Sequence, residues 1–123
     1  MKRTCMAFVM ALTAIGWAAP SSAQSFGNAM VVNNEQIIIG EPVYEMRSGV
    51  VYVFDRDGDG DWVQSQMLEP SEASAANRFG ISLATQDDLL LVSATRADSG
   101  TGAIYMFESD GGTWSEVGRL VTD

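Results

Sequence analysis

The segment GVVYVF at residues 49–54 is the most informative part of the sequence, because its pattern returns 53 residues later as GAIYMF at residues 102–107. In both stretches a glycine is followed by apolar residues, a tyrosine and a phenylalanine. The match extends toward the N-terminus, where residues 26–49 align without a gap on residues 79–102 at the same offset. Self-similarity at a fixed spacing indicates that a chain is built from copies of one structural unit. We therefore interpret the chain as an internal duplication.

The duplication continues toward the C-terminus after the deletion of one residue. Trp62 aligns with Trp114 and Leu68 with Leu120, now at an offset of 52. The first copy occupies residues 24–78 and the second occupies residues 79–123.

Each copy contains four short runs rich in β-branched and aromatic residues, separated by clusters of Gly, Asn, Asp and Ser. This composition is typical of β-strands joined by turns. In the first copy we expect strands over residues 28–32, 36–39, 50–54 and 62–68. In the second copy we expect strands over residues 81–85, 89–92, 103–107 and 114–120. The predicted fold class is all-β, with two four-stranded antiparallel blades.

The second and third strands of each copy are almost continuous in apolar residues, as at residues 37–39 and 50–54. Such strands are typical of sheets that are covered on both faces. Blades of a β-propeller are covered in this way, because each lies between two neighbours. A two-layer sandwich is the alternative, since its buried strands look similar. Because a propeller closes with at least four blades, two copies predict an incomplete propeller that self-associates or joins further blades.

These residues resemble the FG-GAP repeat, which builds the β-propeller of integrin α chains and of many bacterial secreted proteins. Phe26-Gly27 and Phe79-Gly80 match the Phe-Gly half of the repeat, and Gly-x-x-Tyr-x-Phe followed by Trp is similar to the bacterial form. The second half of the motif, GAP, is only partly retained: the corresponding residues are Gly40-Glu41-Pro42 in the first copy and Ser93-Ala94-Thr95 in the second. The resemblance implies a β-propeller module for binding or adhesion, with a protein or carbohydrate ligand at the cell surface.

One departure from the family concerns calcium. Integrin-type repeats place an acidic calcium loop between the first two strands. Here that position holds residues 33–36 in the first copy and residues 86–88 in the second, and neither has an alternating acidic pattern with a glycine. The metal ligands of the family therefore cannot be transferred to either copy.

An alternating acidic pattern does occur between the third and fourth strands. Asp55, Asp57, Asp59 and Asp61 fit the beginning of a calcium loop, in which alternate carboxylates converge on the cation. The twelfth position holds Gln66 in place of the bidentate glutamate. The same stretch contains Asp-Gly pairs, which favour a plain hairpin turn. The sequence thus leaves two interpretations, a weak calcium site formed by these four aspartates and a solvated turn.

The first 23 residues have the organisation of a signal peptide. Lys2 and Arg3 precede the apolar stretch Phe8–Ala19, which is too short to span a bilayer as a helix. Small residues ending at Ala23 suit cleavage by a signal peptidase. We expect secretion to the periplasm or the cell exterior, and no membrane insertion after cleavage.

Charge and composition exclude several classes of function. Beyond residue 23 the chain has five arginines, no lysine, no histidine and no cysteine, against sixteen acidic residues. This balance disfavours nucleic acid and anionic membranes, both of which attract Lys and Arg. Without His or Cys the mature chain lacks a histidine base, a thiol nucleophile and a His/Cys zinc site. We expect a non-catalytic module; the alternative is an accessory propeller of a larger secreted enzyme, such as a polysaccharide-acting hydrolase.

Four aromatic residues recur at the same positions of the two copies. Trp62 and Tyr52 correspond to Trp114 and Tyr105. Aromatic rings of this kind form a carbohydrate-stacking surface or pack between blades. Their recurrence at the same repeat position favours packing.

Overall fold

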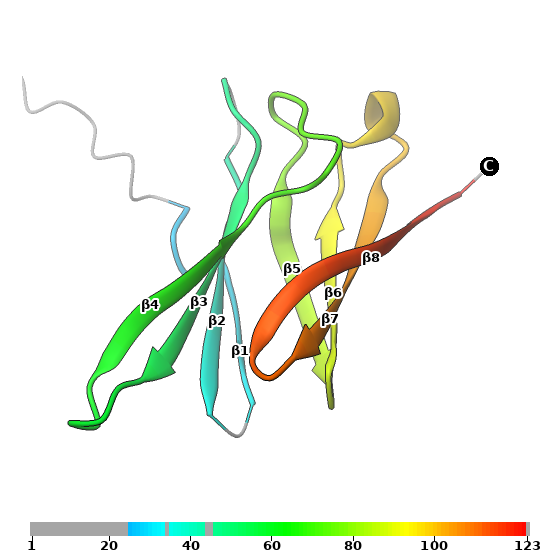
Figure 1. Cartoon of the computed structure of the whole chain (residues 1–123). Helices are drawn as coiled ribbons and strands as arrows, with labels where there is room; N and C mark the ends of the chain where they lie inside the picture. The colour runs from blue at the N-terminus through cyan, green and yellow to red at the C-terminus, as the bar shows by residue number, and fades with distance from the viewer. Residues whose placement is uncertain (1–24, 34, 44–45, 123) are drawn as a thin grey trace, which may run out of the picture.

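The computed structural model describes residues 25–33, 35–43 and 46–122, which form two four-stranded antiparallel sheets (Figure 1). The predicted signal peptide, residues 1–23, lies outside the described residues. Sheet 1 contains β1 (Ala29–Val32), β2 (Gln36–Glu41), β3 (Val50–Arg56) and β4 (Trp62–Leu68). Sheet 2 contains β5 (Phe79–Gln86), β6 (Leu89–Ala94), β7 (Ala103–Asp110) and β8 (Thr113–Val121).

The strands of each sheet follow one another in chain order, each paired with the next. This confirms the all-β prediction and the four strands expected in each copy; β1 begins one residue later than predicted, and several other strands are extended by two or three residues. Outside the strands, the described residues contain one short 3-10 turn, η2 (Asp98–Gly100). No helix in this part of the chain has the length and apolarity needed to cross a membrane.

The two sheets also share an irregularity in strand pairing. The register of β3 against β4 shifts between Val53 and Phe54, and that of β7 against β8 shifts between Met106 and Phe107. These positions correspond in the alignment of the two copies. An extra residue of this kind bends the bulged strand and increases its twist. The duplication therefore extends from the sequence to the detailed shape of each sheet.

Each sheet has two faces, because successive side chains of a strand point to opposite sides. We name them after one residue each. The tyrosine face carries Tyr52 in sheet 1 and Tyr105 in sheet 2. The leucine face carries Leu68 in sheet 1 and Leu120 in sheet 2.

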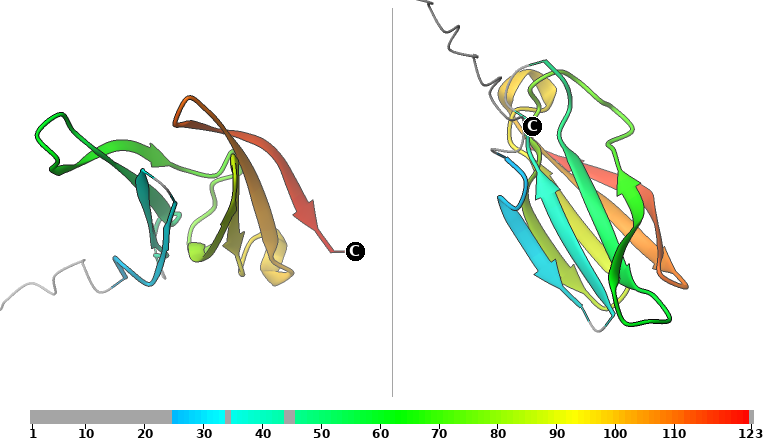
Figure 2. Two further views of the ribbon diagram at one scale, coloured as in Figure 1. Left: turned by 90° about the horizontal axis from the view of Figure 1, so that it is seen from below. Right: turned by 90° about the vertical axis from the view of Figure 1, so that its left-hand side faces the viewer.

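The hydrophobic core lies between the sheets, where the tyrosine face of sheet 2 packs on the leucine face of sheet 1. Figure 2 shows the two sheets side by side. β5 contacts β1, β2 and β3, and β4 contacts β8. The core side chains are Ile38, Val51, Val53 and Leu68 from sheet 1 and Phe79, Leu90, Val92, Tyr105, Phe107 and Trp114 from sheet 2. Full burial of an aliphatic or aromatic side chain contributes about 1.5–3 kcal/mol.

Two glycines of sheet 1 allow the sheets to approach closely. A Cβ atom added to Gly40 would lie 2.0 Å from the carbonyl oxygen of Gly80. A Cβ atom added to Gly49 would lie 1.9 Å from the carbonyl oxygen of Phe79. The backbone of Phe79-Gly80 therefore lies directly on sheet 1, which gives the predicted Phe-Gly pair a packing function.

The expected cover on both faces is present on only one face of each sheet within the described residues. The tyrosine face of sheet 1 and the leucine face of sheet 2 both remain partly exposed. The contact joins non-equivalent faces of two similar sheets, as between neighbouring blades. A duplicated sandwich with two-fold symmetry would instead bring equivalent faces together.

Candidate functional site: the acidic hairpin end

The connections between strands differ at the two ends of the sheets. The β1–β2, β3–β4, β5–β6 and β7–β8 connections all lie at the lower end in Figure 1 and are short turns. The β2–β3, β4–β5 and β6–β7 connections lie at the upper end and are longer. We call the lower end, with its four short turns, the hairpin end. Loops held on a rigid scaffold are common binding sites, so both ends are candidates.

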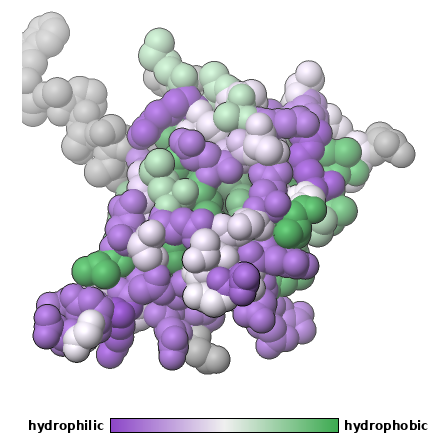
Figure 3. Space-filling view, in the orientation of Figure 1, coloured by the Kyte–Doolittle hydropathy of each residue, from purple (hydrophilic) through white to green (hydrophobic). Residues whose placement is uncertain are grey.

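Negative charge is concentrated at the hairpin end, where Figure 3 shows mainly hydrophilic residues. Nine of the sixteen acidic residues of the chain lie in its turns or in the adjoining ends of the strands. They are Glu35, Asp55, Asp57, Asp59, Asp61, Asp87, Asp88, Glu108 and Asp110. Among the described residues, Arg56 is the one cationic side chain at this end. The hairpin end therefore carries a strong negative potential.

The upper end carries mixed charges that are partly paired. Arg47 forms an ion pair with Glu41 at 3.4 Å. Arg119 pairs with Glu72 and, at 2.9 Å, with Asp98. These contacts offset the arginine charges locally, so the strongest unbalanced charge of the described residues is at the hairpin end.

A groove of about 710 Å³ opens between the sheets at the hairpin end. Carboxylates from both sheets line it, together with amide and hydroxyl groups. The lining residues are Asn33, Glu35, Gln36, Asp55, Thr85, Asp87, Asp88, Ser109, Gly111 and Gly112. The groove contains no cationic and no aromatic lining residue, which makes it suitable for a positively charged or hydrogen-bonding ligand.

Gln36 forms one wall of this groove and connects the two sheets. Its Nε2 donates hydrogen bonds to Oδ1 of Asp55 and to the backbone oxygen of Gly112, both at 2.8 Å. Its Oε1 accepts a hydrogen bond from Nε1 of Trp114 at 2.9 Å. Because Gln36 is buried, these bonds satisfy an amide that would otherwise be costly to desolvate.

Gln66 adds a second connection. Its Nε2 donates to the backbone oxygen of Trp114 at 2.6 Å, and its Oε1 accepts from the backbone N–H of Trp114 at 2.9 Å. The side chain thus pairs with β8 as a neighbouring strand would. Together, Gln36 and Gln66 hold the edges of the groove in a defined relative position.

Sequence reasoning missed both glutamines. Gln36 lies at the beginning of an apolar strand, and its counterpart in the second copy is Leu89. Gln66 occupies the twelfth position of the calcium-loop pattern, where a glutamate is expected, and its counterpart is Gly118. An amide that occurs in one copy and is apolar or absent in the other is a signal that could have identified both.

The structure places the four predicted calcium ligands in two settings. Asp57 stabilises the β3–β4 turn: its Oδ1 accepts hydrogen bonds from the backbone N–H groups of Asp59 and Asp61, both at 2.9 Å. Asp55 lies on β3 and accepts a hydrogen bond from Gln36. Within the described residues, no group of three or more acidic side chains is close enough to hold a metal ion. These contacts support the turn interpretation, and calcium binding stays a prediction.

The recurring aromatic residues have different environments in the two copies. Tyr105 and Trp114 are buried between the sheets, in agreement with the packing interpretation. Trp62 is 39% exposed, and the guanidinium of Arg56 lies 4.9 Å from its ring centroid. Such a cation–π contact covers part of the indole ring. Tyr52 is partly exposed, and its hydroxyl donates to Oε2 of Glu41 at 2.8 Å.

Part of the chain matches a known protein family. The family model of the FG-GAP repeat matches residues 62–107, from the beginning of β4 to Phe107 in β7. The matched segment therefore contains one outer strand of sheet 1 and the first three strands of sheet 2. No curated protein matches the chain.

Proposed function

We propose, from the premise that the chain contains an FG-GAP repeat, that this protein is a secreted, non-catalytic β-propeller module that binds a positively charged protein segment. The binding surface is the acidic groove at the hairpin end. FG-GAP repeats form β-propeller modules that often serve in binding.

The observation that carries this proposal is the unequal distribution of charge. In the described part of the chain, nine acidic residues and one arginine lie at the hairpin end, and four of the nine line the groove between the sheets. Lysine and arginine side chains form short, charge-assisted hydrogen bonds with carboxylates. A surface of one sign also accelerates encounter with a ligand of the opposite sign and orients it.

The groove favours a basic ligand over the carbohydrate ligand that the sequence leaves open. Carbohydrate recognition by stacking needs an accessible aromatic face. Trp114 is buried in the core, and Arg56 lies over Trp62. The groove residues themselves include no aromatic ring.

Calcium is a second, smaller proposal for the same end of the molecule. A cation at the β3–β4 turn would compete with the two backbone N–H groups for Oδ1 of Asp57. The proposed affinity is therefore weak, in the range of about 10⁻⁴–10⁻³ M known for extracellular modules. The alternative function, an accessory propeller in a larger secreted enzyme, would use the same surface. The binding test below therefore applies to the binding module and to the accessory propeller alike.

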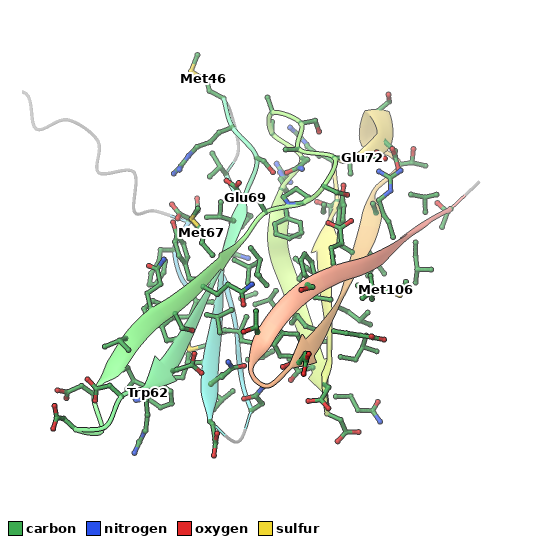
Figure 4. All side chains as sticks on the ribbon, viewed as in Figure 1. Met46, Trp62, Met67, Glu69, Glu72 and Met106 are labelled. Atoms are coloured by element: carbon green, nitrogen blue, oxygen red, sulfur yellow. The ribbon has the colours of Figure 1, made fainter. Side chains whose placement is uncertain are left out.

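Titration of the protein with a short lysine- and arginine-rich peptide tests the proposal. We expect binding that weakens as salt is raised, because exposed charges are screened within about 8 Å at physiological ionic strength. Asp88→Asn should weaken binding several-fold. Glu69→Gln removes the same charge at the upper end (Figure 4) and should leave affinity nearly unchanged. Equal losses in the two variants, or equal binding of a glutamate-rich peptide, would contradict the proposal.

A further inference from the structure

The tyrosine face of sheet 1 and the leucine face of sheet 2 are of the two kinds that pack together inside the chain. The contact inside the chain joins the tyrosine face of sheet 2 to the leucine face of sheet 1. Among the described residues, this leaves one face of each kind without a sheet packed on it, on opposite sides of the molecule. Figure 4 shows Met67 on the side of sheet 1 away from sheet 2, and Met106 on the opposite side of the molecule.

The tyrosine face of sheet 1 has nearly the same arrangement as the tyrosine face of sheet 2, which packs on sheet 1. The rings of Phe26 and Tyr52 meet edge to face with centroids 5.6 Å apart, and the corresponding rings of Phe79 and Tyr105 are 5.3 Å apart. The glycine after each phenylalanine has nearly the same positive φ, 82° and 86°. Phe26 is nevertheless 47% exposed, whereas Phe79 is fully buried. The first face is therefore a preformed but uncovered version of the second.

The leucine face of sheet 2 is correspondingly open. Leu120 is 51% exposed and Ile104 is 38% exposed, whereas their counterparts Leu68 and Val51 are 4% and 0% exposed. Single exposed apolar residues are ordinary on a protein surface. Here they occupy the positions that form the core contact in the other copy.

An apolar groove of about 480 Å³ lies on this open leucine face. Its lining includes Ser93, Gly102, Ile104 and Leu120. The residues that correspond to Ser93 and Gly102 in sheet 1 are Gly40 and Gly49, on which the backbone of Phe79-Gly80 lies. The groove is thus in the position that receives a Phe-Gly pair in the contact within the chain.

We propose that a second copy of this chain occupies these faces, with the tyrosine face of its sheet 1 against the leucine face of sheet 2 and its Phe26-Gly27 in the apolar groove. The contact continues the interface that already exists between the two sheets. Because it joins non-equivalent faces, it leads either to a closed ring or to an open stack of copies. Two copies that close on each other would form a ring of four sheets.

Three differences make this contact weaker than the one inside the chain. Ser93 corresponds to Gly40, where an added Cβ would lie 2.0 Å from the carbonyl oxygen of Gly80. Unlike Gly40, Ser93 has a Cβ. A Phe-Gly strand of a second copy must therefore lie farther out. In addition, Leu89 and Gly118 replace the two glutamines that bind Trp114. We expect association that is reversible and depends on concentration.

Two variants, each altered on one face, test the proposal by sedimentation velocity over a range of concentrations. Met30→Lys alters the tyrosine face of sheet 1, and Leu120→Lys alters the leucine face of sheet 2; both residues are more than half exposed. Each variant alone should be monomeric where the unaltered protein associates. An equimolar mixture should form a 1:1 dimer, because each variant retains the face that the other lacks.

Two controls separate this contact from non-specific aggregation. Met46→Lys, at a residue that is 91% exposed at the upper end, should leave association unchanged. Ser93→Gly should strengthen it several-fold, and unfolding midpoints should show that all variants are folded. Monomeric behaviour of the unaltered protein, association of either single-face variant alone, or a mixture that stays monomeric would overturn the proposal.

Discussion

The backbone of Gly80 lies so close to Gly40 that a Cβ atom on Gly40 would be 2.0 Å from the carbonyl oxygen of Gly80. No real Cβ atom is found at such a distance, and backbone atoms in a sheet have little room to move. The two sheets are therefore held at a spacing that depends on the absence of one methyl group.

Gly40→Ser should destabilise the protein by about 1–3 kcal/mol, because a side chain at a filled interface forces the sheets apart. Gly58→Ser is the matched control, since no atom beyond Gly58 and its two chain neighbours lies within 4 Å of a Cβ at that position. Urea denaturation of both variants measures the difference in the free energy of unfolding. Equal stability of the two variants would show that the sheets are not in close contact at Gly40.

Gln36→Ala should cost about 1–3 kcal/mol, because it leaves Nε1 of the buried Trp114 without its acceptor. Gln64→Ala, on the exposed part of β4, is the matched control and should change stability little. Denaturation gives the free energies, and the fluorescence of Trp114 should change only in the first variant. If Gln36→Ala were as stable as its control, the hydrogen bonds of Gln36 between the sheets would make no net contribution to the free energy of unfolding.

The contact between Tyr52 and Glu41 should make the free energy of unfolding depend on pH in the alkaline range. Partial burial, followed by the hydrogen bond to Glu41 and its charge, raises the pKa of Tyr52 above its ordinary value of 10.0. The folded protein then holds the phenolic proton where the unfolded chain has lost it. The resulting stability is complete below about pH 10 and is lost as pH rises through the folded pKa.

Denaturation at about pH 9 and about pH 11, on either side of the ordinary tyrosine pKa, tests this sign. The free energy of unfolding should fall more steeply in the unaltered protein than in Tyr52→Phe, which has no proton to lose at this position. Absorbance titration should show one tyrosine ionising above its ordinary range in the unaltered protein and not in the variant. An identical pH dependence in both proteins would contradict the raised pKa.

Calcium titration distinguishes the two interpretations of the β3–β4 turn. The calcium proposal predicts heat in the millimolar range for the unaltered protein and none for Asp57→Ala, Asp59→Ala. Equal heats from the two proteins would mean that calcium does not bind at this turn, which is then stabilised by the hydrogen bonds to Asp57 alone. In either case Asp57→Ala should destabilise the protein more than Asp59→Ala, because Asp57 accepts the two backbone hydrogen bonds of the turn.

The amino-acid pattern alone is sufficient to predict the duplication, the eight strands and their antiparallel order. These follow from local pattern, because β-branched runs, glycine turns and a fixed repeat spacing are all visible along the chain. The resemblance to the FG-GAP repeat, carried by Phe26-Gly27 and Phe79-Gly80, was also available at this level. So was the acidic character of the turns, since each Asp is visible where it occurs.

Which faces meet, and which side chains join them, depends on how the two sheets pack. Ile37 and Ile38 look alike in the sequence, yet Ile38 is fully buried and Ile37 is on the partly open face. Gln36 and Gln66 bind Trp114 across 78 and 48 residues of sequence, a separation that no local pattern spans. The physical reason is that strand propensity is set by neighbours in the chain, whereas burial, groove formation and hydrogen bonding between sheets depend on how two distant copies pack.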